Sequence, residues 1–186
     1  MTKKGNLFVI SGSSGVGKGT LISLLLKKNP NIMLSISHTT RLPRVGEIDG
    51  INYFFRTKED FKKSIEENAF LEWAQYSDNF YGTKKKFVEK KLNEGFDLIL
   101  EIDTQGALKV KEKMPEAILI FILPPSLKDL ENRLRGRQTE SEEVIQKRLN
   151  FVENEMKNSK FYDFQIINDD LSIALEKLEG IINSYA

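Results

Sequence analysis

The segment that most constrains how this chain folds is Gly12–Lys18, Gly-Ser-Ser-Gly-Val-Gly-Lys, which fits the pattern G-x-x-x-x-G-K. It follows a short apolar run, Leu7–Ser11, and opens a stretch, residues 18–28, whose leucines recur at helical spacing. Glycines let backbone N–H groups approach an anion closely, and a helix N-terminus adds unpaired donors. The pattern therefore predicts a strand, a phosphate-binding loop (P-loop) and a helix, rather than a Gly/Ser segment that merely turns the chain.

We expect a nucleoside triphosphate to contact this whole segment: Gly12, Ser13, Ser14, Gly15, Val16, Gly17, Lys18, Gly19 and Thr20. Lys18 is expected to bridge the β- and γ-phosphates. Gly19 occupies the position where Ser or Thr usually follows the lysine, so no side chain there can bind Mg²⁺. Either Thr20 takes a related role, or phosphates and water hold the metal. Gly19, and the lack of an Asn-Lys-x-Asp motif in the sequence, disfavour a switch-type GTPase.

Further apolar segments predict buried strands at residues 97–101, 117–123 and 165–168, with a helix over 104–113. Strands that alternate with helices are typical of an α/β fold with a parallel sheet flanked by helices. We expect one domain over residues 1–186, whose core comprises about 1–37, 87–125 and 158–186.

Two segments interrupt the alternation of strands and helices. Residues 38–86 carry aromatic-rich strand candidates at 51–55 and 70–76 and a helix start at Thr57–Asp60, which predicts a small mixed α/β insertion. The second interruption carries a polar, basic loop at 133–139 between two predicted helices, the later one over 140–157, and we expect both interruptions to be mobile parts of the one domain.

Composition excludes several classes of function. The chain has no cysteine, so disulfides, thiolate metal sites and cysteine nucleophiles are excluded. The formal net charge of +1 does not indicate a nucleic acid or a membrane as a partner. The N-terminal apolar run is too short for a signal peptide or a membrane span, so we expect a cytoplasmic protein.

The arginines are clustered. Six of the seven lie in two groups, which are Arg41 and Arg44, then Arg133, Arg135, Arg137 and Arg148. The planar guanidinium group matches phosphate oxygens bidentately, so the groups are candidate phosphate sites, although solvated helix faces are the alternative.

Several motifs, in order along nearly the whole chain, carry a resemblance to a known family: Thr39-Thr40-Arg41-Leu42-Pro43-Arg44-Val45-Gly46-Glu47, Glu72-Trp73-Ala74, Tyr81-Gly82-Thr83, Leu100-Glu101-Ile102-Asp103, Pro124-Pro125-Ser126, Arg133-x-x-x-Arg137 and Asn168-Asp169-Asp170. With these motifs the sequence resembles the guanylate kinase family. The family loop often has Pro where Ser13 stands.

The resemblance implies a GMP site in the insertion. Arg41, Arg44, Tyr53 and Tyr81 would grip the GMP phosphate, and Glu47 would orient an arginine. Glu72 and Asp103 would accept hydrogen bonds from guanine, with hydroxyls from Ser37 and Thr83. Taken singly, the tyrosines could be half-buried core aromatics, Glu72 could be a solvated strand residue, and His38 is more simply read as incidental.

The resemblance also implies that residues 126–157 form a helical lid, whose Arg133, Arg137 and Arg148 close over the ATP phosphates, and that Asn168 touches the adenine edge. The implied catalytic set is Lys18, Arg41, Arg137 and Arg148. The implied reaction is ATP + GMP → ADP + GDP with Mg²⁺, by a monomer or homodimer. It needs no general base, because the attacking group is already a phosphate oxygen. The alternatives are a kinase for another nucleoside monophosphate and a non-catalytic guanylate-kinase-like module that binds phosphorylated peptides.

Overall fold

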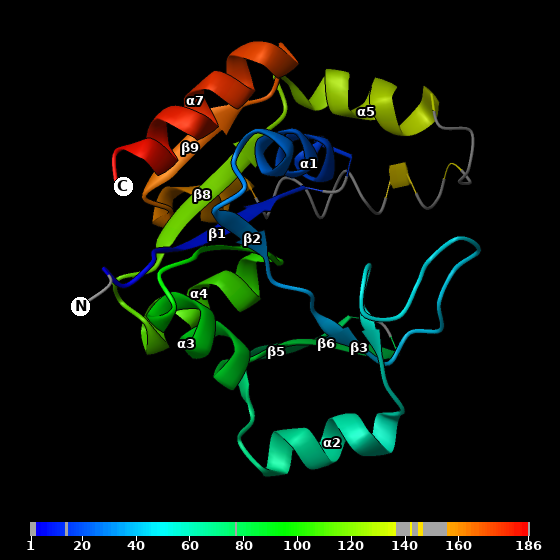
Figure 1. Ribbon diagram of the computed structural model, residues 1–186. Coiled ribbons are helices and arrows are strands. Elements are labelled where there is room, and N and C mark those ends of the chain that lie inside the picture. The colour runs from blue at the N-terminus through cyan, green and yellow to red at the C-terminus, as the bar shows by residue number, and fades with distance from the viewer. Residues whose placement is uncertain are drawn as a thin grey trace. The chain divides into compact units, whose positions relative to one another are not determined.

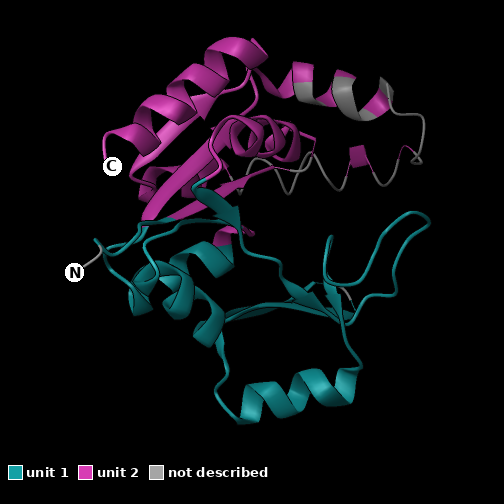
Figure 2. Ribbon diagram, viewed as in Figure 1, with its two compact units in different colours: residues 1–7, 31–100, 105–117 teal, residues 8–30, 101–104, 118–186 magenta. Residues whose placement is uncertain are grey.

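The structure is a computed structural model of the 186-residue chain, and it describes residues 3–13, 15–76, 78–136, 142, 145, 146 and 156–185. The chain divides into two compact units (Figure 2). Unit 1 comprises Met1–Leu7, Asn31–Leu100 and Gln105–Ala117, and unit 2 comprises Phe8–Pro30, Glu101–Thr104 and Ile118–Ala186.

Parallel strands form the centre of unit 2. The buried strand β1 (Leu7–Gly12) pairs in parallel with β8 (Ile118–Leu123), and β8 pairs in parallel with β9 (Phe164–Ile167). Strands β1 and β8 are short apolar runs, as expected where both faces of a sheet are covered, whereas β9 at the sheet edge contains Gln165 and is partly exposed. The order of the complete five-stranded sheet is β2-β7-β1-β8-β9, so the predicted parallel α/β sheet is confirmed.

Two helices of unit 2 pack together on this framework (Figure 1). Helix α1 (Lys18–Lys28) follows β1 and contacts α7 (Leu171–Asn183), which also packs along β9. Asp170 caps α7 by accepting hydrogen bonds from the N–H groups of Ser172 and Ile173. Helix α5 (Leu127–Gly136) and the short 3₁₀ helix η1 (Ser159–Phe161) complete the unit's described elements.

Unit 1 contains both parallel and antiparallel strand pairs. Strand β2 (Ile32–Leu34) pairs in parallel with β7 (Asp97–Glu101). A separate four-stranded sheet has the order β4-β3-β6-β5, formed by β3 (His38–Thr39), β4 (Phe54–Phe55), β5 (Phe70–Tyr76) and β6 (Asn79–Lys84). The helices are α2 (Lys58–Glu66), α3 (Lys85–Asn93) and α4 (Thr104–Lys113). The mixed insertion predicted for residues 38–86 corresponds to this four-stranded sheet with α2.

Two local predictions were wrong. The strand predicted at 51–55 is only Phe54–Phe55, because residues 50–52 form a turn between the bridge residues Asp49 and Tyr53. In this turn Gly50 donates to the Tyr53 carbonyl, and Asn52 accepts from the Ile48 N–H. The basic loop predicted at 133–139 is wrong for residues 133–136, because α5 continues to Gly136, and residues 137–139 lie outside the described residues. An i,i+4 ion pair between Glu131 and Arg135 favours that extra turn. The helix predicted over 140–157 lies mostly outside the described residues.

Candidate active site

The loop after β1 has the backbone geometry of an anion site. A Cβ atom at Gly12 would come within 2.4 Å of the Ile122 carbonyl oxygen, so only glycine fits against β8. Gly17 is the N-cap of α1, with φ of 97°, and it supplies no side chain to cap the helix. The first N–H groups of α1 are therefore available to a ligand rather than to a capping side chain.

Lys18 folds back onto this loop. Its Nζ donates to the carbonyl oxygens of Gly12 and Ser13, the latter at 3.1 Å. The Ser13 side chain is fully buried, and its hydroxyl has no hydrogen-bond partner among the described residues. Ser14 is outside the described residues, and Gly19 and Thr20 are exposed. Lys18, which the sequence predicts to contact the donor phosphates, thus lies against two carbonyl groups of the phosphate-binding loop.

Asn168 joins the same loop from the far end of the sequence. It follows β9, is 6% exposed, and its Nδ2 donates to the Val16 carbonyl at 2.7 Å. Sequence reasoning did not foresee this contact, since Val16 and Asn168 are 152 positions apart and no local pattern connects them.

In unit 1, Glu72 and Thr83 form a buried polar pair. They are Cα partners in β5 and β6, 4% and 0% exposed, and the Thr83 hydroxyl donates to Glu72 Oε1 at 2.7 Å. A solvated strand position for Glu72 is therefore excluded. A carboxylate accepts several hydrogen bonds, so it can bind donors of a ligand while it keeps the hydroxyl.

Four other predicted GMP residues gather at one end of the same sheet. Arg41 donates from Nη2 to Glu47 Oε1 at 2.8 Å, and its guanidinium lies 5.4 Å from the centre of the Tyr53 ring. The rings of Tyr53 and Tyr81 meet edge to face at 6.1 Å. The cluster combines a cation with two phenols, groups that donate to a phosphate.

Glu47 accepts hydrogen bonds from Arg41 and also from Arg44. Its second oxygen, Oε2, accepts from the backbone N–H of Arg44 at 2.7 Å. The Arg41 hydrogen bond, followed by the Arg44 N–H, holds the pKa of Glu47 below its usual value. The same bond raises the pKa of Arg41. Glu47 thus links the Arg41 side chain to the Arg44 backbone, and its role in orienting an arginine toward a ligand stays a prediction.

The structure describes only some of the remaining predicted site residues. Ser37 is half-buried directly before β3, and Asp103 is exposed between β7 and α4, in unit 2. Arg133 belongs to α5, but its side chain is outside the described residues, as are Arg137 and Arg148 entirely.

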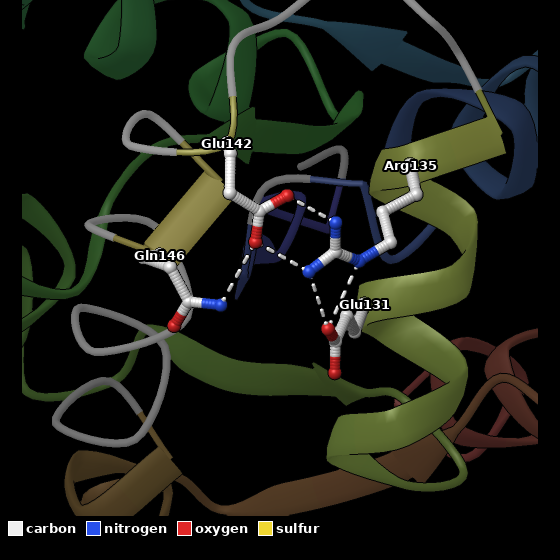
Figure 3. Close-up of polar contacts among 4 residues, drawn as sticks. All are labelled: Glu131, Arg135, Glu142 and Gln146. Carbon is white, nitrogen blue, oxygen red and sulfur yellow. Dashed lines mark hydrogen bonds and ion pairs between the residues drawn. The ribbon is translucent and has the colours of Figure 1, made fainter.

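Arg135, which the resemblance did not assign to ATP, is held by carboxylates (Figure 3). It donates to Glu131 Oε1 at 2.8 Å and to both oxygens of Glu142, which also accepts from Gln146. These hydrogen bonds raise the pKa of Arg135, first through Glu142 and then through Glu131. In this structure the guanidinium of Arg135 is thus paired with two carboxylates, those of Glu131 and Glu142.

Two lysines that were not among the predicted site residues contact β5, the strand that contains Glu72. From α4, Lys109 Nζ donates to the Trp73 carbonyl at 2.8 Å and Lys113 Nζ donates to the Leu71 carbonyl at 2.6 Å. Both carbonyls belong to β5, the edge strand of its sheet. Lysines four positions apart are ordinary on a helix surface, so the sequence carries no signal for this contact.

A buried parallel strand, a glycine-rich loop and a helix that begins at the loop lysine define the class of P-loop phosphate-binding α/β proteins. The sequence matches the family described as "Guanylate kinase" over residues 4–185. The chain belongs to the guanylate kinase family, and it is an ATP:GMP phosphotransferase.

Individual relatives agree with the family match. The chain is 56% identical over 180 residues to a guanylate kinase of Caldanaerobacter subterraneus subsp. tengcongensis, covering 97% of this chain and 87% of the relative. It is 52% identical over 182 residues to a guanylate kinase of Clostridioides difficile, covering 98% and 89%. The crystal structure of guanylate kinase from Anaplasma phagocytophilum superposes with a TM-score of 0.81 at 31% identity, covering 99% of this chain and 87% of that one. The resemblance and fold class predicted from the sequence are confirmed.

The structure also bears on membrane association. Among its described residues, none of the helices has the length and apolar character needed to cross a membrane.

Proposed function

We propose that the chain transfers the γ-phosphoryl group of ATP to GMP with the loop residues 12–20 holding the donor and the four-stranded sheet of unit 1 holding the acceptor. The observation that carries the residue assignment is the buried Glu72–Thr83 pair. A carboxylate accepts several hydrogen bonds, so Glu72 can keep the Thr83 hydroxyl and also accept from N1–H and the exocyclic amino group of guanine.

The same pair gives a reason for base selectivity. At the corresponding edge adenine presents an acceptor at N1, which faces a carboxylate unfavourably. Buried polar groups left unpaired by the wrong substrate discriminate strongly against it. Asp103 is proposed as the second acceptor for guanine, and Ser37 and Thr83 as hydroxyl contacts.

The phosphate of GMP is assigned to the cluster around Arg41. Arg41, Tyr53 and Tyr81 already contact one another, and Glu47 fixes the Arg41 side chain before any ligand arrives. Preorganised donors contribute more to catalysis than donors that must be gathered at each turnover. Arg44 is proposed to join them.

The donor phosphates are assigned to the loop, to Lys18 and to the lid. Lys18 is proposed to exchange its bonds to the Gly12 and Ser13 carbonyls for phosphate oxygens. Arg133, Arg137 and Arg148 are proposed to neutralise charge on the moving phosphoryl group. Catalysis in this scheme consists of positioning and charge stabilisation.

The residues near the loop fit a magnesium ion bound mainly through ATP. Among the described residues, no group of three or more His, Cys, Asp or Glu side chains is placed to hold a metal. Thr20, which is exposed in the first turn of α1, is the candidate protein ligand. Bound Mg²⁺ would neutralise charge on the donor phosphates. A cytoplasmic location and a monomeric or homodimeric state remain predictions.

A coupled assay that detects ADP tests the proposal. With ATP as donor, GMP is expected to be phosphorylated far faster than AMP, UMP or CMP. The Lys18→Ala protein, purified in parallel, controls for contaminating kinases. If AMP served as well as GMP, the assignment of Glu72 and Asp103 to guanine would be wrong.

A further inference from the structure

Asn168 is held in place by hydrogen bonds from both its backbone and its side chain. The Asn168 backbone N–H donates to the Leu123 carbonyl at 2.8 Å, which fixes the residue at the carboxyl end of β8 and β9. Its side-chain Nδ2 then reaches the Val16 carbonyl at 2.7 Å. Both Val16 and Asn168 are buried, so the hydrogen bond is shielded from water.

This hydrogen bond sets the direction of a neighbouring donor. The structure has no cis peptide bond among its described residues. In a trans peptide the C=O of one residue and the N–H of the next point in opposite directions. Because Asn168 holds the Val16 carbonyl, the Gly17 N–H is fixed pointing away from Asn168.

Gly17 and Asn168 also fit each other sterically. A Cβ atom built at Gly17 would lie 2.6 Å from Asn168 Nδ2, closer than a contact allows. Gly17 also has φ of 97°, a conformation that favours glycine. The amide of Asn168 therefore occupies the space that a side chain at position 17 would need.

We propose that Asn168 is a positioning residue of the phosphate loop, whose amide holds the Val16–Gly17 peptide so that the Gly17 N–H is preorganised to donate to a phosphate of the nucleotide. This inference rests on the proposed function, in which the loop binds the donor triphosphate. It differs from the adenine contact implied by the family resemblance, because its effect does not depend on the base.

Inorganic tripolyphosphate separates the two roles, since it carries the phosphates without the base. The experiment measures the Kd of ATP, tripolyphosphate and GMP, with Mg²⁺, for the wild type and Asn168→Ala by titration calorimetry. We expect both ATP and tripolyphosphate to bind about tenfold more weakly, which corresponds to about 1.4 kcal/mol. The Kd of GMP is expected to stay within about twofold, which also reports that the variant is folded.

The chain offers a matched control. Asn29 Nδ2 donates to the Leu25 carbonyl at 3.0 Å, the same kind of bond at the other end of α1. Asn29→Ala is expected to leave both phosphate affinities unchanged. If Asn168→Ala does not fold, Asn168→Leu keeps the volume of the side chain, removes the donor and adds no charge.

Two results would overturn the proposal. If ATP binding weakened while tripolyphosphate binding did not, Asn168 would be a reader of adenine. If neither changed, the Val16 contact would be without functional effect. A wild-type chain that bound tripolyphosphate but failed to phosphorylate GMP would contradict the proposed function, while the binding comparison would still decide the role of Asn168.

Discussion

The phosphate loop of unit 2 and the four-stranded sheet of unit 1, which is proposed to bind GMP, build their sites in different ways. The loop presents consecutive backbone groups between β1 and α1, and side chains such as Asn168 hold its peptides in place. The sheet presents side chains from separated positions, and strand pairing brings them together, as with Glu72 and Thr83. Substitutions should therefore affect donor binding and acceptor binding separately.

The largest expected effect is that of Lys18→Ala on the loop. Removing the cation that is proposed to stabilise charge on the transferred phosphoryl group should lower kcat by about 10²- to 10³-fold or more, as for other groups that stabilise a transition state. The Kd of GMP should change little, because Lys18 belongs to the loop assigned to the donor phosphates, where its Nζ donates to the carbonyls of Gly12 and Ser13. Steady-state kinetics and GMP titration measure the two quantities.

Lys28→Ala is the control on the same helix, since Lys28 pairs with Glu179 at the exposed end of α1. Its kcat should match that of the wild type. Wild-type turnover by Lys18→Ala would instead refute the assignment of the loop to the donor phosphates.

The next-largest effect is expected from a substitution in the sheet of unit 1 that is proposed to bind GMP. Glu72→Gln keeps the shape of the side chain but replaces one acceptor oxygen with a donor, which faces the guanine donors unfavourably. The Kd of GMP should rise about 10- to 100-fold, because hydrogen bonds to charged groups are among the stronger ones. The Kd of ATP should stay within about twofold. Glu59→Gln, on the exposed face of α2, is the matched control. Equal losses for ATP and GMP would indicate a structural role.

The same contrast explains what the sequence could predict. The loop was predictable because its strand, glycines, lysine and helix are contiguous, so each residue's role follows from its place in a local pattern. The central strands and α4 were predictable from apolar runs and helical spacing. Helix α3 and strand β6 were not anticipated, because lysine-rich and mixed segments carry weaker periodicity.

The acceptor site depended on the family resemblance, since nothing local pairs Glu72 with Thr83. Their register follows an irregularity in β5 between Phe70 and Glu72, which composition does not reveal. Likewise, the clustering of arginines could not separate Arg135, which is held by Glu131 and Glu142, from neighbours assigned to phosphate. The role of each arginine depends on the side chains that it contacts, and the tertiary structure determines those contacts.

A smaller effect is expected from Glu47→Gln, which tests whether preorganisation matters at the acceptor phosphate. The variant keeps the side-chain shape but loses the charge that holds Arg41 and the Arg44 N–H. Because ion pairs near the surface contribute modestly, KM for GMP should rise about two- to fivefold, with KM for ATP unchanged. Glu142→Gln weakens a comparable pair in unit 2 and should leave KM for GMP unaltered. An unchanged KM for GMP in Glu47→Gln would show that Arg41 needs no orienting partner.

The smallest effect concerns stability of the acceptor sheet and its only histidine. His38 packs against Phe54 at 4.7 Å between ring centres, and burial, followed by the charges of Lys84 and Arg56, lowers its pKa to about 4. The unfolded chain, with a histidine pKa near 6.5, therefore binds more protons between about pH 6.5 and pH 4. Stability contributed by neutral His38 is complete above this window and is lost as pH falls through it, by about 1–2 kcal/mol after allowing for solvent screening.

Urea unfolding of the wild type and His38→Phe at pH 7.5 and pH 4.5 measures this contribution. Phenylalanine keeps the aromatic contacts with Phe54 and Phe70 and cannot be protonated. Because the chain contains one histidine, the carboxylates that titrate near pH 4.5 affect both proteins alike, and their difference isolates the imidazole. The wild type should lose about 1–2 kcal/mol more than the variant between the two pH values. Equal losses would mean that His38 is protonated as easily in the folded sheet as in the unfolded chain, and that the aromatic packing around it does not exclude water.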